Sequence, residues 1–291
     1  MSVGNINMPL KNKLDSSLDV DSYDLTDADW NWWNNLPQVW KNVFLGNLIS
    51  LTRYKKWDHV GYQVGEGLKL ELSTDDELKK IINCERIKRI EFRQRINDVA
   101  PLAYLKKLQY VALVIGNEVD FNALTDLLNL KELAIWTYRD DITIDIKPIS
   151  LLSQLTSLHI ANLINSDISL LGKLVNLERL SLSSNRIKDI TAIGNLVKLK
   201  YMYLYNNEIE NIEPLAALTQ LSEVYLKDNQ IKDISSLSNL NELKKIDIRN
   251  NLSIDLRHLA DLPKIEHILY NAATYHRPES IKDKLRYFLD Y

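Results

Sequence analysis

The amino-acid sequence predicts an α/β solenoid, with a parallel sheet on its concave side, short helices or turns on its convex side, and a helical cap at each end. Three observations predict this fold: a 22-residue repeat, a change of apolar spacing inside each repeat, and helical patterns near both termini. The repeat is plainest where the same run, Leu-x-x-apolar-x-apolar-x-x-Asn, begins at Leu177, Leu199, Leu221 and Leu243. A fixed period of this size is typical of structural units that stack on one another.

Each repeat is predicted to contain a strand followed by a return segment. Leu180 and Leu182 lie two residues apart, which is typical of a strand with one buried face. The apolar residues from 187 to 196 then recur every three positions, which favours a tight turn or short helix on the opposite side. No single repeat could enclose its own apolar side, so we expect the stack to supply the core.

An asparagine recurs at the end of each of these strands. The backbone leaves the strand there, and its polar groups need partners inside the turn. An inward amide side chain both donates and accepts hydrogen bonds, so we expect a structural ladder. Its predicted members are Asn185, Asn207, Asn229 and Asn251.

These repeats resemble those of leucine-rich-repeat proteins of the 22-residue class. The phrases NRIKDITAIGNL, NNEIENIEPLAAL and DNQIKDISSLSNL are similar to internalin repeats, which are bacterial, and to repeats of the leucine-rich regulatory subunit of type-one protein phosphatase. The resemblance implies a leucine-rich-repeat solenoid. It does not identify a partner, because repeats of this kind serve many unrelated ones.

The repeats before Leu177 are less regular. Their strands are expected to begin at Ile87, Leu108, Leu130 and Leu155, where the asparagine position holds Arg95, Gly116, Tyr138 and Leu163. The interval from Leu130 to Leu155 is three residues longer than the others. The surplus falls in residues 136–145 and predicts a protruding loop, either functional or a product of sequence drift.

Both ends of an open stack need lids, and the sequence predicts four segments on this basis. They are an acidic leader, expected to be disordered, at 1–22; a tryptophan-rich helical cap at 23–66; the solenoid at 67–270; and a helical C-terminal cap at 271–291. In the first cap, Pro37 suits a helix start before Trp40, Phe44, Leu48 and Leu51. In the second, Pro278 precedes Ile281, Leu285, Phe288 and Leu289 at helical spacing.

The N-terminal tryptophans admit a second interpretation. Five of the six fall close together, at Trp30, Trp32, Trp33, Trp40 and Trp57. They could form a lid that packs on the first repeat, or a platform for a carbohydrate or peptide, with a possible enzymatic role.

Composition argues against several other classes of function. A net charge of −3 gives no general attraction for nucleic acid or anionic membranes. No sequence pattern indicates a catalytic site, a cofactor or a metal: the five histidines lack close ligand spacing, and there is no glycine-rich phosphate loop. The single cysteine, Cys84, rules out an internal disulfide framework and suits a reducing compartment. No secretion signal is evident, and we expect a cytoplasmic monomer that is not an enzyme.

Binding is the better-supported function, and the strand register predicts where it occurs. The third, fifth and seventh positions of each repeat should face outward on the concave side, opposite the buried leucines. Four tyrosines thereby gather on adjacent strands with charges around them, which resembles an interface centre with a polar rim. The alternative is that tyrosine is simply a residue that favours exposed strands. The predicted partner-binding residues are Tyr201, Tyr203, Tyr205, Tyr225, Arg179, Glu223, Lys227, Lys245, Asp247, Arg249, Trp136 and His159.

An open sheet suits a protein or long peptide better than a small metabolite, because it offers no enclosing pocket. The leading hypothesis is therefore a non-catalytic interaction scaffold. A regulatory or targeting subunit of an enzyme, as the phosphatase-subunit resemblance implies, is the alternative.

Overall fold

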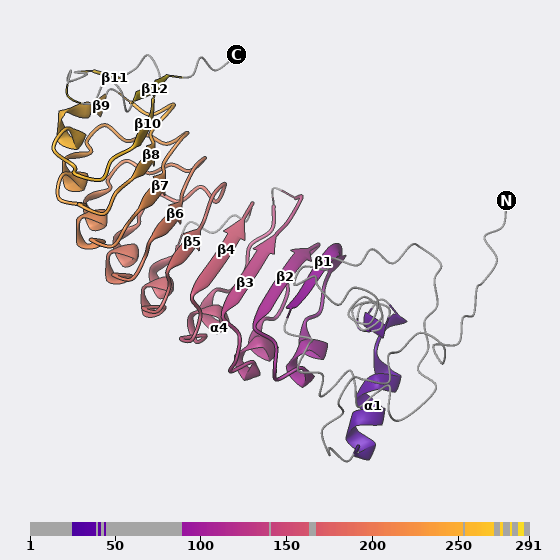
Figure 1. The fold of residues 1–291 in the computed structure, drawn as a ribbon. Coiled ribbons are helices and arrows are strands. Elements are labelled where there is room, and N and C mark those ends of the chain that lie inside the picture. The colour runs from indigo at the N-terminus through magenta and orange to yellow at the C-terminus, as the bar shows by residue number, and fades with distance from the viewer. Residues whose placement is uncertain are drawn as a thin grey trace. The chain divides into compact units, whose positions relative to one another are not determined.

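The computed structural model describes most of the chain in two compact units, residues 1–131 and 132–291 (Figure 1). The described residues are 25–38, 40, 41, 44, 89–139, 141–162, 167–252, 254–270, 274, 275, 280 and 285–287. The predicted leader at 1–22 lies outside them, as do Leu48, Leu51, Trp57 and Cys84.

Unit 1 contains one helix, two strands and two short 3-10 turns among its described residues. They are α1 (Asp27–Asn35), β1 (Arg89–Ile96), η2 (Ala100–Tyr104), β2 (Tyr110–Ile115) and η3 (Asn122–Asp126). β1 and β2 pair in parallel, with an irregularity between Glu91 and Arg95. Both faces of β2 are buried from Val111 to Ile115.

Helix α1 begins at a capping box. The Asp29 carboxylate accepts a hydrogen bond from the Thr26 backbone N–H at 2.7 Å, and the Thr26 hydroxyl caps the Asp29 backbone N–H in return. A second helical stretch follows Pro37, whose carbonyl accepts from Trp40 N at 2.9 Å. Asp29 is therefore a buried capping residue and part of the helix. Helix α1 and the helical residues that follow Pro37 lie within the segment predicted as a helical cap, 23–66.

Unit 2 consists of strands that alternate with short helical turns. They are β3 (Glu132–Trp136), α4 (Lys147–Ser150), β4 (Ser157–Ala161), η4 (Ser169–Lys173), β5 (Arg179–Ser181), η5 (Thr191–Asn195), β6 (Tyr201–Tyr203), η6 (Glu213–Ala217), β7 (Glu223–Tyr225), η7 (Ser235–Leu237), β8 (Lys245–Asp247), β9 (Ile254–Asp255), η8 (Leu256–Leu259), β10 (His267–Tyr270), β11 (Thr274–Tyr275) and β12 (Leu285–Tyr287).

The strands of unit 2 form a parallel sheet in the order β3-β4-β5-β6-β7-β8-β10-β12, and the turns line the other side (Figure 1). Strands β9 and β11 make a separate parallel pair. Register advances by one repeat per strand, so that Tyr201 pairs with Arg179 on one side and Glu223 on the other. The predicted solenoid of strand and return segment is confirmed.

The core of unit 2 lies between the sheet and the turns. Leu180, Met202, Val224 and Ile246 are fully buried on the inner face of neighbouring strands. The return segments of the regular repeats are 3-10 turns, which explains their apolar spacing of three, since side chains at i and i+3 share a face in that geometry.

The predicted helix near the C-terminus is wrong for residues 285–287. These form strand β12, which pairs in parallel with β10 through Ile268 and Leu285 and through Tyr270 and Tyr287. Apolar spacing favoured a helix, but the edge of β10 offers unpaired backbone groups, and hydrogen bonding to them outweighs a weak local preference. Most of the remaining segment, 271–291, lies outside the described residues.

The longer repeat protrudes less than its extra length suggested. Tyr138 is 70% exposed, but Thr137 before it and Ile142 and Ile144 after it are buried. Isoleucines at every second position give this extended segment one apolar side. Part of the insertion therefore packs into the core of unit 2.

Candidate functional site

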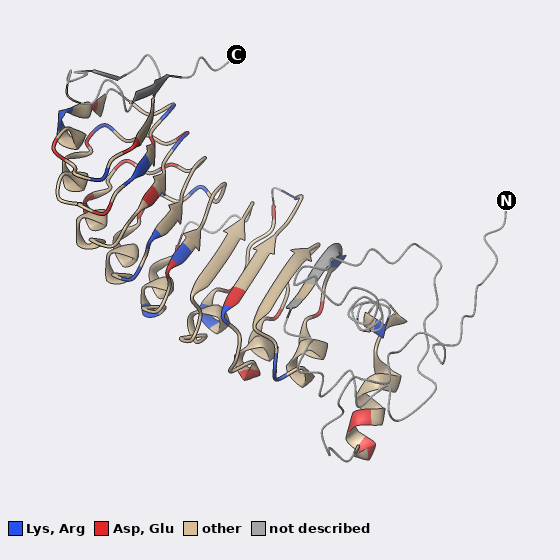
Figure 2. Ribbon diagram, in the orientation of Figure 1, with Lys and Arg blue, Asp and Glu red and all other residues tan. Residues whose placement is uncertain are grey.

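The outward side of the unit 2 sheet is the candidate site, called here the sheet face. It comprises the third, fifth and seventh residues of the repeats that contain β3 to β8. Alternation along each strand sets it, since Leu180, Met202 and Val224 point inward and their neighbours point outward. Charged residues of both signs lie along β5 to β8 (Figure 2).

The four tyrosines lie together on this face. The rings of Tyr203 and Tyr225 stack with centroids 4.8 Å apart and an interplanar angle of 11°. These residues are register partners on β6 and β7, so the equal length of the repeats places them side by side. Tyr201 lies beneath the Arg179 guanidinium, which is 4.6 Å from its ring centroid. Tyr205 is 42% exposed.

Tyr225 is also the middle of a polar chain across β7 and β8. Its hydroxyl donates to Glu223 Oε2 at 2.7 Å, and the Lys245 ammonium lies 5.1 Å from its ring centroid. Burial raises the pKa of Tyr225, and the hydrogen bond to Tyr225 raises the pKa of Lys245. At neutral pH the phenol is therefore protonated, so that it can donate to Glu223, and the amine is charged.

The remaining charges near the C-terminal ends of the strands are largely self-neutralised. Arg249 contacts the Asp247 carboxylate through two hydrogen bonds, at 2.9 and 2.7 Å. Asp247 is only 4% exposed, so it has little surface to offer a partner and instead fixes Arg249. The Lys227 ammonium lies 3.7 Å from the neighbouring Asp228 carboxylate.

Trp136 and His159 form a separate pair. Their rings meet edge to face at 6.4 Å, and burial lowers the pKa of His159, which keeps the imidazole neutral at neutral pH. Strand β5 lies between this pair and the tyrosines of β6. It ends at Ser181, and Ser183 follows two residues later. Both serines are buried although they occupy outward positions, and within the described structure the Ser183 hydroxyl has no hydrogen-bond partner.

The predicted asparagines are buried and bridge successive repeats. Asn207 donates through Nδ2 to the carbonyls of Leu182 at 3.0 Å and Leu204 at 2.9 Å, and its Oδ1 accepts from Ile187 N at 3.0 Å. Asn229 and Asn251 repeat these contacts one and two turns further on. Each side chain thus supplies partners for backbone groups of its own repeat and of the preceding one.

Sequence reasoning missed a second polar column, at the start of each return turn. One side-chain oxygen there accepts from the backbone N–H two residues later at 2.8 to 2.9 Å, which caps the turn. We call it the turn-cap column, and its members are Asp98, Asp120, Asp145, Asp167, Asp189, Asn211, Asp233 and Asp255. The signal was available as an Asp or Asn at the repeat period, and it continues where the ladder asparagines are absent.

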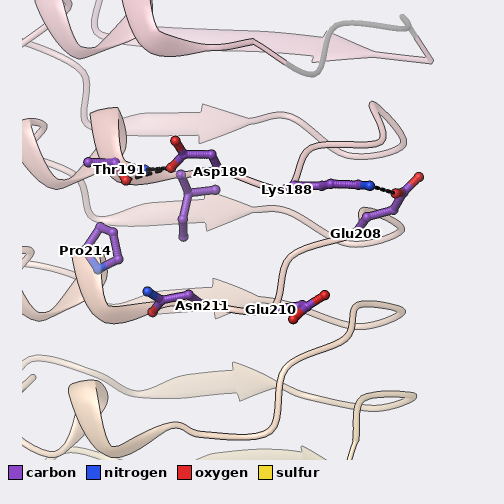
Figure 3. Close-up of a pocket in the computed structure, with 8 residues that line it drawn as sticks. Lys188, Asp189, Thr191, Glu208, Glu210, Asn211 and Pro214 are labelled. Carbon is purple, nitrogen blue, oxygen red and sulfur yellow. Dashed lines mark hydrogen bonds and ion pairs between the residues drawn. The ribbon is translucent and has the colours of Figure 1, made fainter.

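A pocket of about 300 Å³ lies on the flank of unit 2, away from the sheet face (Figure 3). Several of its polar groups are already engaged in the fold. Asp189 accepts from the Thr191 hydroxyl, which lowers the pKa of Asp189, and Lys188 lies 3.3 Å from Glu208. Within the described ranges, no group of His, Cys, Asp and Glu could hold a metal ion. Nor does that part of the chain contain a helix of the length and apolarity that crossing a bilayer requires.

The described N-terminal tryptophans, at positions 30 to 40, belong to unit 1 and do not form an open platform. Trp33 and Trp40 are each 3% exposed, and Trp32 stacks on Tyr104 of η2 with ring centroids 4.6 Å apart. This arrangement is typical of a lid. It leaves no row of exposed rings among the residues described there for a sugar to stack on.

The repeats also match known proteins. The family described as Leucine Rich repeats (2 copies) matches residues 175–217 and 197–239, which include β6, β7 and all four tyrosines of the cluster. The repeats in this stretch are leucine-rich repeats. The predicted class is confirmed, while the resemblance to the phosphatase subunit stays a prediction. No curated protein matches the chain.

Solved leucine-rich-repeat structures share this fold. Internalin C2 of Listeria monocytogenes is 26% identical with a TM-score of 0.58, over 64% of this chain and 81% of that one. Internalin InlF of the same organism is 23% identical with a TM-score of 0.56, over 76% of each chain. The plant peptide hormone receptor RGFR1, solved in complex with RGF2, is 19% identical with a TM-score of 0.55, over 72% of this chain and 36% of the receptor.

Proposed function

We propose that this protein is a non-catalytic scaffold that binds a protein or long peptide through the sheet face, with Tyr201, Tyr203, Tyr205 and Tyr225 as anchors. The observation that carries the proposal is the aromatic cluster on β6 and β7, stacked within itself and flanked by Arg179 and Lys245. Tyrosine offers a large contact area with few rotatable bonds, and such residues dominate binding energy at interfaces.

The order within the cluster favours binding over a simple preference of tyrosine for strands. Stacking and the Lys245–Tyr225–Glu223 chain hold the rings of Tyr203 and Tyr225 before any partner arrives. Side chains that are already fixed lose less conformational entropy on binding, which strengthens association. The similarity to a receptor solved with a peptide hormone agrees with this use of the fold, but at 19% identity it supports the fold alone.

The size of the face favours a macromolecular partner. A stable interface buries about 800 Å² on each side, more than a small metabolite can cover on an open sheet.

We further propose that the protein acts in the cytoplasm. This proposal rests on its single cysteine and is tested by cell fractionation.

Affinity capture from the lysate of the native organism tests the function. The bait is the full chain, compared with a variant in which Tyr201, Tyr203, Tyr205 and Tyr225 are replaced by alanine. The control variant replaces exposed apolar residues off the sheet face, Leu151, Val175, Val197 and Leu252, by alanine. All three proteins must first give matching circular dichroism spectra and unfolding curves.

We expect a defined protein to be retained by the wild type and the control but lost from the tyrosine variant, with affinity reduced at least about tenfold because hot-spot residues cost about 2 kcal/mol or more each. A partner that both variants retain equally would place the binding site elsewhere, and the proposal for the sheet face would then be wrong.

A further inference from the structure

The charged side chains of the sheet face on β7 and β8 are engaged with their neighbours. Glu223 accepts from the Tyr225 hydroxyl, the Lys245 ammonium lies 5.1 Å from the Tyr225 ring centroid, and Arg249 is held by Asp247. Lys227 lies beside Asp228. Arg179, on β5, is exposed, and no carboxylate or hydroxyl among the described residues contacts its guanidinium. The positive charge of Arg179 is therefore left for a partner to neutralise.

The Arg179 guanidinium is nevertheless held in place. Its Cζ lies 4.6 Å from the Tyr201 ring centroid, and these two residues are register partners on adjacent strands. The guanidinium has five N–H donors, so a contact with a ring on one side leaves donors for a partner. A fixed, planar fork of donors matches the two oxygens of a carboxylate, and part of the entropy cost of ordering the side chain has already been met.

We infer that Arg179 is the charge-selective anchor of the sheet face, and that it binds the side-chain carboxylate of an Asp or Glu on the partner. This inference rests on the proposed function, because it names the chemistry that the partner brings to the tyrosine cluster. Arg179 would fix the orientation of the partner, while the stacked rings of Tyr203 and Tyr225 supply the apolar contact beside it.

A carboxylate fits this environment better than a phosphate chain. A nucleic acid is bound by several cations that neutralise successive phosphates. Here the neighbouring outward residue on β7 is Glu223, and the protein carries a net charge of −3. One localised negative charge, placed among tyrosines, is the ligand that the Arg179 guanidinium can neutralise.

The test selects binders from a displayed library of random linear peptides, with the full chain as bait. Selected sequences are synthesised with amidated C-termini, so that only side chains supply carboxylates. Their affinities are measured for the wild type and for Arg179→Gln, Arg179→Lys and Arg186→Gln. Arg186 is the matched control: it is an exposed arginine of the same repeat that lies beyond the strand and off the sheet face.

We expect the selected peptides to share an acidic residue. Their affinity should fall about tenfold or more for Arg179→Gln, less for Arg179→Lys, which keeps the charge but loses the fork, and not at all for Arg186→Gln. Replacing the acidic residue of the peptide by its amide should cause the same loss on the wild type and little further loss on Arg179→Gln. Arg179 is exposed, so unfolding curves of its variants should coincide with that of the wild type.

Two outcomes would overturn the inference, and they are distinguishable. Peptides that require the four tyrosines but bind Arg179→Gln as tightly as the wild type would refute the role of Arg179 and leave the proposed function standing. If no peptide is retained, or if the retained peptides are indifferent to alanine at the four tyrosines, both the inference and the function assigned to the sheet face are contradicted.

Discussion

At the scale of single residues, the buried asparagines show how one side chain can serve two repeats. Asn207 donates to a carbonyl of its own repeat and to one of the preceding repeat, while Oδ1 accepts from backbone N–H groups of Asn185 and Ile187. An aspartate could not donate, and an apolar residue could do neither. The amide is therefore specified by the turn, independently of any partner.

Asn207→Ala should destabilise the protein by about 2 to 5 kcal/mol, because each buried polar group left without a partner costs about 1 to 3 kcal/mol. The measurement is urea unfolding followed by circular dichroism. Asn239→Ala is the control, since Asn239 is exposed and its replacement should change stability by no more than about 0.5 kcal/mol. Equal effects of the two substitutions would mean that the amide ladder contributes nothing specific.

The candidate site could be predicted from sequence only as far as periodicity reaches. Alternation fixed which residues face outward, and the equal repeat length placed Tyr203 beside Tyr225. The solvent exposure of an outward side chain could not be predicted from alternation. Asp247 is buried because it contacts Arg249, two residues further along the chain. Such burial depends on the rotamers of neighbouring side chains, which no spacing rule specifies.

At the scale of elements, the turn-cap column gives the return turns a common start. In Asp167 and Asp233 a hydrogen bond from a backbone N–H lowers the pKa of the carboxyl group, and in Asp189 the Thr191 hydroxyl is the larger cause. A carboxyl group whose folded pKa is depressed stabilises the fold above its unfolded pKa. That contribution is lost as the pH falls through the folded value.

Replacing Asp167, Asp189 and Asp233 together by asparagine should flatten the loss of stability between about pH 5 and pH 3, the range in which ordinary carboxyl groups titrate. The caps themselves should persist, because Asn211 already caps its turn through a side-chain oxygen at 2.8 Å. The measurement is the thermal midpoint across this range. A matching triple alanine variant should lose stability at neutral pH as well.

If the asparagine variant retained the full acid sensitivity of the wild type, other carboxyl groups would account for it. The caps would then be structurally present but not linked to pH.

The C-terminal strand shows where element prediction fails. Leu285 has apolar neighbours at helical spacing, yet residues 285–287 extend the sheet beside β10. A helix and a strand can share the same short apolar pattern, and the choice is made by what lies next to it. The regular repeats were not ambiguous in this way, because the same strand-and-turn spacing recurs in each of them.

At the scale of the whole molecule, stacking makes the stability of unit 2 a property of neighbours. Each repeat contacts the one before and the one after, through backbone pairing, the asparagine ladder and the apolar columns. The sequence predicts this architecture well because the same pattern of apolar residues and asparagines recurs in successive repeats. It does not specify the partner, whose contacts fall on the outward positions that the repeat leaves free to vary.

Deletion of one whole repeat, residues 199–220, should leave a folded chain. The cut joins Lys198 to Leu221, so strand β5 meets β7 in the same register that it held with β6. Far-UV circular dichroism and a single cooperative unfolding transition would show this, with stability reduced by the loss of one repeat and its interface. Binding should be lost as well, because Tyr201, Tyr203 and Tyr205 are removed.

Deletion of half a repeat, residues 199–209, is the control. It removes strand β6 and the ladder residue Asn207, so that one return segment runs directly into the next, and it should abolish cooperative unfolding. If the whole-repeat deletion were equally disruptive, the repeats could not be interchangeable stacking units.

The turn-cap column divides each repeat into a part of constant length and a part that can change. From Asp98 to Leu108, and again from Asp145 to Leu155 and from Asp189 to Leu199, the interval is ten residues, and the three surplus residues of the longer repeat all fall ahead of the cap. The part of each repeat from the turn cap to the next strand therefore has a constant length. New sequence can be inserted between the strand and the cap without disturbing the stack. An engineered recognition loop would belong there, beside the face that carries the tyrosines.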